Sequence, residues 1–208
     1  MSDHPSARLP DAKRRALLRA AAAEFAAHGF GQASLNRIIR EVGMSKSSFY
    51  HFYADKSDLF RQTLDSALVP LLAVHGQVDI DALSRETLWP EVMRMAANLS
   101  QLVSANPEMV TVGRMFYRCL ENPAERALIE GDLAAFTDWV FALLKRGQEL
   151  GLFRDDLPET LLMDCLMALG MAVDRWMLAH FDENDEAERM ALTAQAFDLF
   201  RRLLAPAG

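Results

Sequence analysis

The residues from Ser34 to Lys56 constrain the fold of this chain more than any other stretch. An apolar stripe at helical spacing ends at Gly43, a residue that readily takes the left-handed conformation in which helices commonly terminate. Ser45 then suits the N-cap of a second helix, because its hydroxyl can accept a free backbone N–H of the first turn. The sequence therefore predicts two short helices joined by a tight turn. The stripe consists of Leu35, Ile38, Ile39 and Val42.

The second of these helices has one aromatic side and one polar side. Phe49, Phe52 and Tyr53 repeat at i, i+3 and i+4, which predicts that they are buried. A short polar helix held by an apolar partner across a glycine turn is typical of helix-turn-helix DNA binders. We therefore predict such a motif at about residues 33–52; the alternative is a helical hairpin with a solvated polar face. The polar side carries Lys46, Ser47, Ser48, Tyr50 and His51.

Charge is distributed unevenly along the chain. The 208 residues carry a formal net charge of −7, which by itself argues against a nucleic-acid partner. Residues 1–64, however, contain ten Lys and Arg against six Asp and Glu and so carry +4, whereas the remainder carries −11. A basic head on an acidic body fits an N-terminal segment that faces phosphates.

Beyond the head, the pattern predicts helices only. We expect an all-α fold of about nine helices, in which a three-helix head at 11–57 precedes a helical body at 58–208. The first ten residues are expected to form a loose arm, and a single helix is expected from Pro123 to Gly151. Capping-box spacing predicts helix starts at Asn122 with Glu125, Asp156 with Glu159, and Asp185 with Glu188.

Membrane, redox and catalytic functions find no support in the sequence. No apolar run approaches the roughly 20 residues of a membrane span, and the N-terminus lacks an apolar signal segment, so we expect a cytoplasmic protein with no membrane partner. Cys119 and Cys165 are too few for a disulfide framework, and we interpret both as core residues rather than a redox switch. Without a Gly-rich phosphate loop, a Gly-x-Ser-x-Gly elbow or paired Glu-x-x-His motifs, we expect no enzyme activity, cofactor or metal site.

The head carries a run of residues that recurs in one protein family. The run comprises Gly29–Phe30, Ser34, the apolar stripe to Val42, Gly43 through Phe52, and Lys56 followed by Leu59–Phe60. It resembles the head of the tetracycline-repressor (TetR) family of bacterial transcriptional regulators, and covers about the first third of the chain. Two positions depart from the family pattern: Ser47 stands where Gly is common, and Ile39 where a small residue is common.

The resemblance implies a role in DNA binding for each polar residue of the head. Ser34 and Arg37 are expected to contact phosphate at the start of the first helix of the motif, and Lys56 from the start of the following helix. Ser45, Lys46, Ser47 and Ser48 are expected at the major groove, and Tyr50 and His51 at its rim. The expected partners are a near-palindromic double-stranded operator and a second copy of the chain.

The body is rich in methionine and aromatic side chains, which suits an adaptable apolar cavity. The resemblance implies a pocket for an unknown, small and largely apolar effector among the fifth to eighth helices, although each residue by itself is better explained as core. The candidates are Met93, Phe116, Tyr117, Trp139, Met167, Met171, Asp174 and Trp176.

The last two helices are apolar over much of their circumference, so each needs more than one neighbour. A four-helix bundle formed by the last two helices of two copies would supply these neighbours, as the resemblance also implies. The candidates for the dimer interface are Ala168, Ala172, Ala196, Leu199, Phe200 and Leu203.

The function that fits these features best is a ligand-responsive transcriptional regulator, in which the effector releases a repressor from DNA. Two alternatives stay open on the sequence. One is a helical small-molecule-binding protein whose DNA binding is impaired, as the departure at Ser47 suggests. The other is a regulator that activates transcription.

Overall fold

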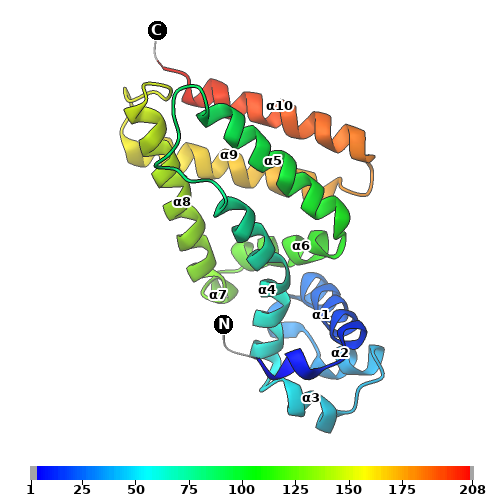
Figure 1. Cartoon of the computed structure of the whole chain (residues 1–208). Helices are drawn as coiled ribbons and strands as arrows, with labels where there is room; N and C mark the ends of the chain where they lie inside the picture. Colours follow the sequence, from blue (N-terminus) through cyan, green and yellow to red (C-terminus); the bar gives the residue numbers. More distant parts are fainter. Residues whose placement is uncertain (1–3, 207–208) are drawn as a thin grey trace. The chain divides into compact units, whose positions relative to one another are not determined.

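The computed structural model describes residues 4–206, which form ten α-helices and one short 3-10 helix without any strand (Figure 1). The predicted all-α fold is confirmed. In chain order the elements are η1 (Pro5–Arg8), α1 (Asp11–Gln32), α2 (Leu35–Glu41), α3 (Lys46–Phe52), α4 (Lys56–His75), α5 (Leu88–Ala105), α6 (Glu108–Glu121), α7 (Pro123–Arg126), α8 (Glu130–Glu149), α9 (Glu159–Ala179) and α10 (Glu186–Leu204).

By their internal contacts these elements form two units. The first, here called the head unit, comprises the chain up to Val69 together with Pro107–Glu130, and so includes α6 and α7. The second, the body unit, comprises Pro70–Asn106 and the chain from Gly131 onward. The chain crosses between the units three times. The boundary at residues 57 and 58 predicted from the sequence stays a prediction, because it divides functions rather than contacts.

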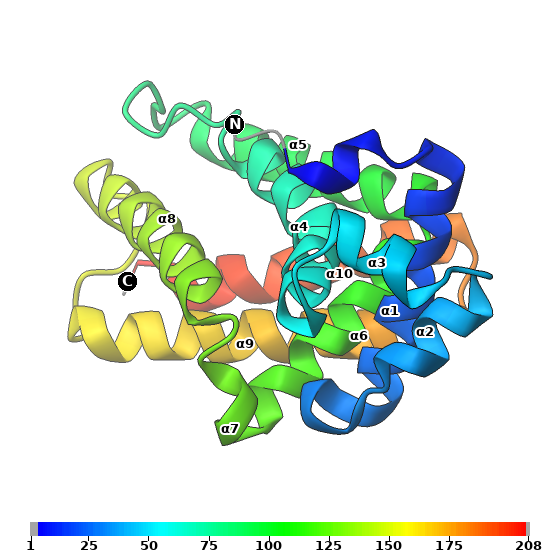
Figure 2. The same cartoon turned by 90° about the horizontal axis from the view of Figure 1, so that it is seen from below.

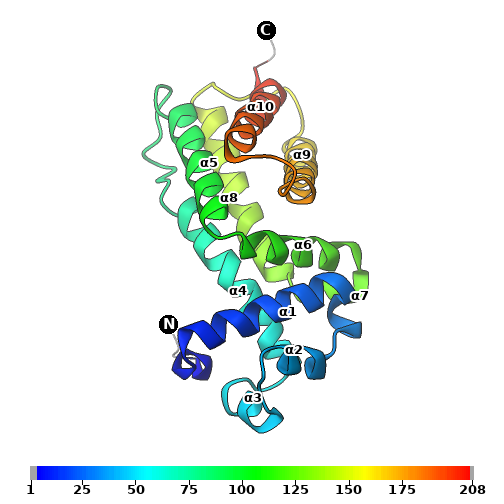
Figure 3. The same ribbon diagram turned by 90° about the vertical axis from the view of Figure 1, so that its right-hand side faces the viewer.

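The head unit is built on the pairing of α1 with α6, which run alongside each other (Figure 3). Leu17, Ala21 and Phe25 of α1 are fully or almost fully buried, and the ring of Phe25 packs against those of Phe30 and Phe60 in the same unit. Met115 of α6 is likewise fully buried. Helices α2 and α3 follow α1 in sequence and lie below this pair in Figure 3; Figure 2 shows the same helices from below.

Residues 4–10 do not form the loose arm that the sequence suggested, and residues 1–3 of that prediction lie outside the described residues. His4 caps the 3-10 helix η1 by accepting the backbone N–H of Ser6 at 3.1 Å, and its Nε2 lies 2.9 Å from a carboxylate oxygen of Asp58. Ser6 and Leu9 are both buried. These contacts attach the segment to the start of α4, and η1 also contacts α3.

The helix predicted from Pro123 to Gly151 is in fact two helices, α7 and α8, separated by a turn at 127–129. Ile129 in that turn is fully buried, which offsets the backbone hydrogen bonds lost at the break. The expected count of about nine helices becomes ten within residues 4–206 for this reason.

Of the three predicted capping boxes, one is complete. Asp185 accepts the N–H of Glu188 and the Glu188 carboxylate accepts the N–H of Asp185, both at 2.9 Å. At the start of α9 the predicted box is wrong, because Asp156 pairs with Arg154 instead. At α7, Asn122 does cap the helix, but the side chain of Glu125 turns away to another partner.

The body unit is held together by one apolar cluster. Its buried members come from α5, α8, α9 and α10, from the segment between α4 and α5, and from the connection between α8 and α9: Val78, Leu83, Leu88, Val92, Met95, Leu144, Phe153, Leu162, Met163, Leu166 and Leu204. At one point the packing depends on a glycine, because a Cβ placed on Gly147 of α8 would lie 2.0 Å from the ring of Phe153. None of the helices in residues 4–206 is long and apolar enough to cross a lipid bilayer.

Candidate nucleic-acid interface

The α2–α3 pair has the predicted helix-turn-helix geometry. Gly43 adopts a φ of +60° at the end of α2, which favours glycine, and the buried side chain of Met44 covers the turn. Ser34 accepts the N–H of Arg37 at 3.4 Å, and Ser45 accepts the N–H of Ser48 at 3.1 Å. Both serines therefore cap their helices, as the sequence indicated.

Helix α3 presents one side to the protein and leaves the other open. Phe49 is fully buried and stacks on the ring of Tyr53, with ring centroids 5.3 Å apart, so the aromatic side anchors the helix. On the opposite side Tyr50 is 58% exposed. The remaining predicted groove residues on this side are also exposed, apart from the half-buried Ser48: Ser45, Lys46, Ser47 and His51.

Ser47, where the family commonly has glycine, lies among other hydroxyl groups. Its Oγ is 3.1 Å from the Oγ of Ser45, so the two side chains hydrogen-bond across the first turn of α3. The Ser47 side chain is thereby oriented beside the helix N-terminus. A hydroxyl can both donate and accept, so this pair presents hydrogen-bonding capacity to a groove without adding charge.

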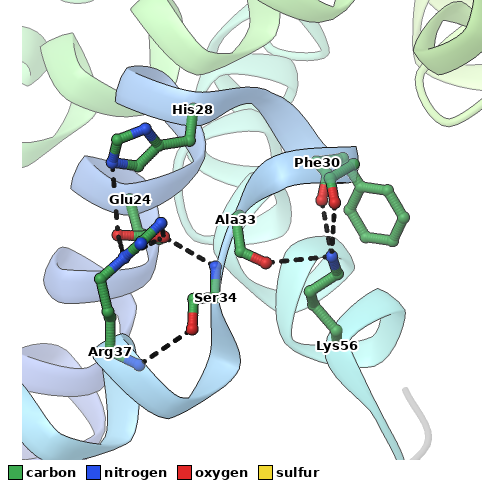
Figure 4. A network of polar contacts seen from close by, with 8 residues as sticks. Glu24, His28, Phe30, Ala33, Ser34, Arg37 and Lys56 are labelled. Atoms are coloured by element: carbon green, nitrogen blue, oxygen red, sulfur yellow. Dashed lines mark hydrogen bonds and ion pairs between the residues drawn. The ribbon is translucent and has the colours of Figure 1, made fainter.

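Arg37, a predicted phosphate contact, is already paired within the head (Figure 4). Its Nε donates to both carboxylate oxygens of Glu24, at 2.9 and 3.1 Å, and its terminal nitrogen donates to the same group. These hydrogen bonds lower the pKa of Glu24, which also accepts the N–H of Ser34 at 2.7 Å. Glu24 thus fixes the start of α2 and the direction of the Arg37 side chain.

Lys56 is engaged even more fully (Figure 4). Its Nζ donates to the carbonyl oxygens of Phe30 at 2.7 Å and Ala33 at 3.1 Å, and lies 4.7 Å from the centre of the Phe30 ring. The ammonium therefore closes the connection between α1 and α2. Its predicted role at a phosphate stays a prediction, and the structure gives this side chain an internal role that the sequence analysis missed.

The predicted effector residues fall in both units. Phe116 and Tyr117 belong to α6 of the head unit, and the other six belong to the body unit. Trp139 and Met167 pack against the body core. Met93, Asp174 and Trp176 are exposed, and Trp176 stacks on His180 with ring centroids 4.2 Å apart. Met171 is half-buried on α9.

A shallow depression of about 500 Å³ does occur in the body unit, but at another place. None of the predicted effector residues lines it. Its walls come from the segment after α4 and from the second half of α8, and they carry five charged side chains: Asp79, Asp81, Lys145, Arg146 and Glu149.

The predicted dimer residues lie on α9 and α10, which contact each other in the body unit. Ala168, Ala172 and Leu199 are exposed, whereas Ala196, Phe200 and Leu203 are half-buried. Further large apolar side chains of the same two helices are exposed as well, namely Leu161, Trp176 and Met190.

The two cysteines have different environments. Cys119 is buried on α6, and burial raises the pKa of its thiol to about 12, so it is an unreactive core residue as expected. Cys165 is exposed on α9, so the interpretation of this residue as core is wrong.

Comparison with known proteins agrees with this geometry. Residues 17–63, which span α1 to the first half of α4, match the model of the bacterial regulatory proteins of the tetR family. The HTH-type transcriptional repressor SCO4008 of Streptomyces coelicolor is 28% identical over 79% of this chain and 79% of its own length.

Two solved structures share the fold. FadR of Bacillus subtilis, in complex with stearoyl-CoA, gives a TM-score of 0.66 at 15% identity and covers 91% of this chain and 97% of its own. SmeT of Stenotrophomonas maltophilia, in complex with triclosan, gives a TM-score of 0.66 at 19% identity and covers 91% of each chain. The matching head segment, the related repressor and the shared fold make the chain similar to transcriptional regulators of the tetR family.

Proposed function

We propose that the protein is a homodimeric repressor that binds a near-palindromic operator through α3 and releases it when a small, largely apolar molecule binds the body. The observation that carries this proposal is the exposed polar side of α3, anchored from behind by buried aromatic rings. Lys46, Ser47, Tyr50 and His51 are exposed on that side. A rigid helix with basic and hydrogen-bonding side chains is what base and phosphate contacts require.

The exposed apolar side chains of α9 and α10 support the homodimer. Trp176, Met190 and Leu199 each expose almost half of their surface. Large apolar side chains that gather on two adjacent helices are characteristic of an interface. A C2 dimer would bring the same two helices of each copy together and present two α3 helices to two half-sites.

The aromatic groups beside α8 support a role in effector binding. The ring of His75 lies 4.9 Å from that of Trp139 and 5.4 Å from that of Phe136. The indole N–H of Trp139 is buried, and within the described residues it has no hydrogen-bond partner. A buried donor without a partner is costly and suits an apolar ligand that carries one acceptor.

The ligands of two proteins with the same fold are consistent with that chemistry. FadR was solved with stearoyl-CoA and SmeT with triclosan, both of which carry a large apolar portion. An effector of this class would act on this chain only by binding the released conformation more tightly than the DNA-bound one.

The decisive experiment measures binding to the DNA upstream of the protein's own gene by fluorescence anisotropy across a salt series. Lys46→Ala is expected to weaken binding and to lower the slope of log Kd against log salt by about one, because one phosphate or base contact is lost. Arg85→Ala removes the same charge from an exposed position of the body unit and is the matched control.

Absence of salt-dependent binding even at low salt would overturn the proposal and favour a protein that binds small molecules only. A reporter gene in a deletion strain gives the sign of regulation: loss of a repressor raises expression, whereas loss of an activator lowers it. For the dimer, Phe200→Asp is expected to halve the mass measured by light scattering, and an unchanged mass would contradict the interface on α10.

A further inference from the structure

Glu125 of α7 is the only buried carboxylate among the residues that the structure describes. A buried charge is costly unless hydrogen bonds compensate it. The predicted capping box at the start of α7 does not compensate the charge of Glu125, because Asn122 alone caps that helix by accepting the N–H of Ala124. Glu125 therefore has a role that the helix in which it lies does not explain.

The carboxylate of Glu125 reaches the end of α1, 94 residues earlier in the chain. Its Oε1 accepts the backbone N–H of Gly31 at 3.0 Å. Its Oε2 lies 3.8 Å from the sulfur of Cys119, whose raised pKa keeps the thiol protonated and able to donate. The two oxygens thus bind one group of α1 and one group of α6, all within the head unit.

The peptide group whose N–H donates to Glu125 also accepts a hydrogen bond at its C=O. The N–H of Gly31 and the C=O of Phe30 belong to the same peptide group, and that C=O accepts the Nζ of Lys56 at 2.7 Å. One peptide group is therefore bonded to a carboxylate at its nitrogen and to an ammonium at its oxygen. Charged partners on both sides polarise the peptide, so each of the two hydrogen bonds strengthens the other.

This peptide lies in the connection on which the start of α2 depends. Lys56 also binds the carbonyl of Ala33, and the next residue, Ser34, caps α2 and donates its own N–H to Glu24. Lys56 itself is the first residue of α4 and follows α3 by only a few residues. A shift of Glu125 would thus reach both the first helix of the motif and the residue that follows the second.

We propose that Glu125 is a positioning residue for DNA binding, which acts on Lys56 through the peptide group between Phe30 and Gly31. The proposal rests on the DNA-binding function proposed above and adds a residue outside the helix-turn-helix. It also connects α7 to the helix-turn-helix through hydrogen bonds, in addition to the continuous chain from α3 into α4. The plainer alternative is that Glu125 only fastens α7 to α1 and affects stability alone.

A double-mutant cycle on operator binding separates these two roles. The variants are Glu125→Ala, Lys56→Gln and their combination, with the helicity of each variant checked by circular dichroism. Glu125→Gln keeps an oxygen that can accept the Gly31 N–H and serves where Glu125→Ala fails to fold. Glu108→Gln is the matched control, because it removes the same charge from an exposed position on α6 of the same unit.

Glu125→Ala is expected to raise Kd at least tenfold in folded protein, Glu125→Gln to recover part of that loss, and Glu108→Gln to stay within twofold of the wild type. In the double variant the increase in Kd should be much smaller than the product of the two single increases, because both substitutions break the same link. The proposal would be overturned if the increase in Kd of the double variant equalled the product of the two single increases. It would also be overturned if the Kd of folded Glu125→Ala stayed within twofold of the wild type.

A second measurement tests the link between Glu125 and Lys56 independently of DNA binding. Hydrogen exchange of the Gly31 amide, followed by NMR, needs no DNA. If the wild-type protein does not bind its upstream DNA, the repressor function fails, and the peptide link is then decided by Lys56→Gln. Faster exchange of the Gly31 amide in that variant supports the link, since Lys56 binds the C=O of this peptide group and not its N–H, and unchanged exchange overturns it.

Discussion

The head unit and the body unit are stabilised by different kinds of interaction. In the head, buried and half-buried charged groups have named partners: Glu24 with Arg37, Lys56 with backbone carbonyls, and Glu125 with the Gly31 amide. In the body, one apolar cluster around residues such as Leu144 and Leu162 holds the helices. Hydrogen bonds with fixed geometry orient the side chains that are proposed to contact DNA, whereas apolar packing fixes what is buried and leaves apolar surface of α9 and α10 exposed.

The sharpest way to break the body unit is to fill the space at Gly147. Alanine there would place a Cβ 2.0 Å from the ring of Phe153, which must move within a close-packed core. We expect Gly147→Ala to lower the free energy of unfolding by about 3 kcal/mol. Chemical denaturation followed by circular dichroism measures the loss. Gly131→Ala, at a position with nothing within 4 Å, should cost nothing or stabilise slightly, and equal losses would contradict the packing argument.

The corresponding test of the head unit is Gly29→Ala. Gly29 has a φ of +71°, and an added Cβ would lie 3.0 Å from Oε1 of Glu125 and 3.2 Å from Nε of Arg118. The strained conformation alone costs about 1–2 kcal/mol, and displacement of Glu125 adds to it. Gly43→Ala is the control, since Gly43 also has a positive φ but has nothing within 4 Å. A loss at Gly29 no larger than the loss at Gly43, by thermal denaturation, would show that the contact with Glu125 contributes little.

A smaller change in stability is expected to distinguish the capping box that is present at α10 from the predicted box that is absent at α9. Asp185→Ala removes the cap of α10 and is expected to cost about 1 kcal/mol. Asp156→Ala breaks only an ion pair with Arg154 at the surface and should change stability little. Urea midpoints of the two variants give the comparison, and a similar loss in both would contradict it.

The smallest expected effect is a pH dependence that belongs to the body unit. Burial lowers the pKa of His75 from its ordinary value of 6.5, so the unfolded chain binds a proton more readily than the folded one. The stabilisation by neutral His75 is therefore complete above pH 6.5 and is lost as the pH falls through that value toward the lower pKa of the folded state. His75→Phe should reduce the difference in melting temperature between pH 7.5 and pH 5.5. The same difference in variant and wild type would contradict this assignment.

Helix starts and turns could be predicted from the sequence because their determinants are local. Ser34, Ser45 and Asp185 each cap a helix through a backbone N–H three residues away. Gly43 likewise needs no information beyond the helix that it ends. Such signals act within a few residues, which is why the helix-turn-helix was predicted with the correct capping residues.

The partners of the charged side chains could not be predicted because they are distant in sequence. Lys56 binds a carbonyl 26 residues away, and Glu125 binds an amide 94 residues away. The family resemblance implied a phosphate for the first, and sequence spacing predicted a capping box for the second. Only the folded chain shows that both side chains meet at one peptide group of the head.

The effector site was the least predictable part, because an apolar side chain in the sequence can belong equally to a core, a ligand pocket or an interface. Trp139 and Met167 pack against the body core, whereas Trp176 was proposed for the same pocket and is exposed. Helical periodicity indicates which residues avoid water, and in the body three different surroundings satisfy that condition equally well.

The membership of α6 and α7 in the head unit has a consequence for how such a protein can be recombined in evolution or by design. A gene segment that ends after Val69 encodes α1 without the helix that covers its apolar side. Its product would lack the buried residues of α6, such as Met115, and would expose the surface of α1 that α6 covers, so it would tend to aggregate. A new sensing body can therefore be grafted only by keeping residues 107–130 with the head, so the heritable unit of DNA binding in this chain consists of two separate stretches of coding sequence.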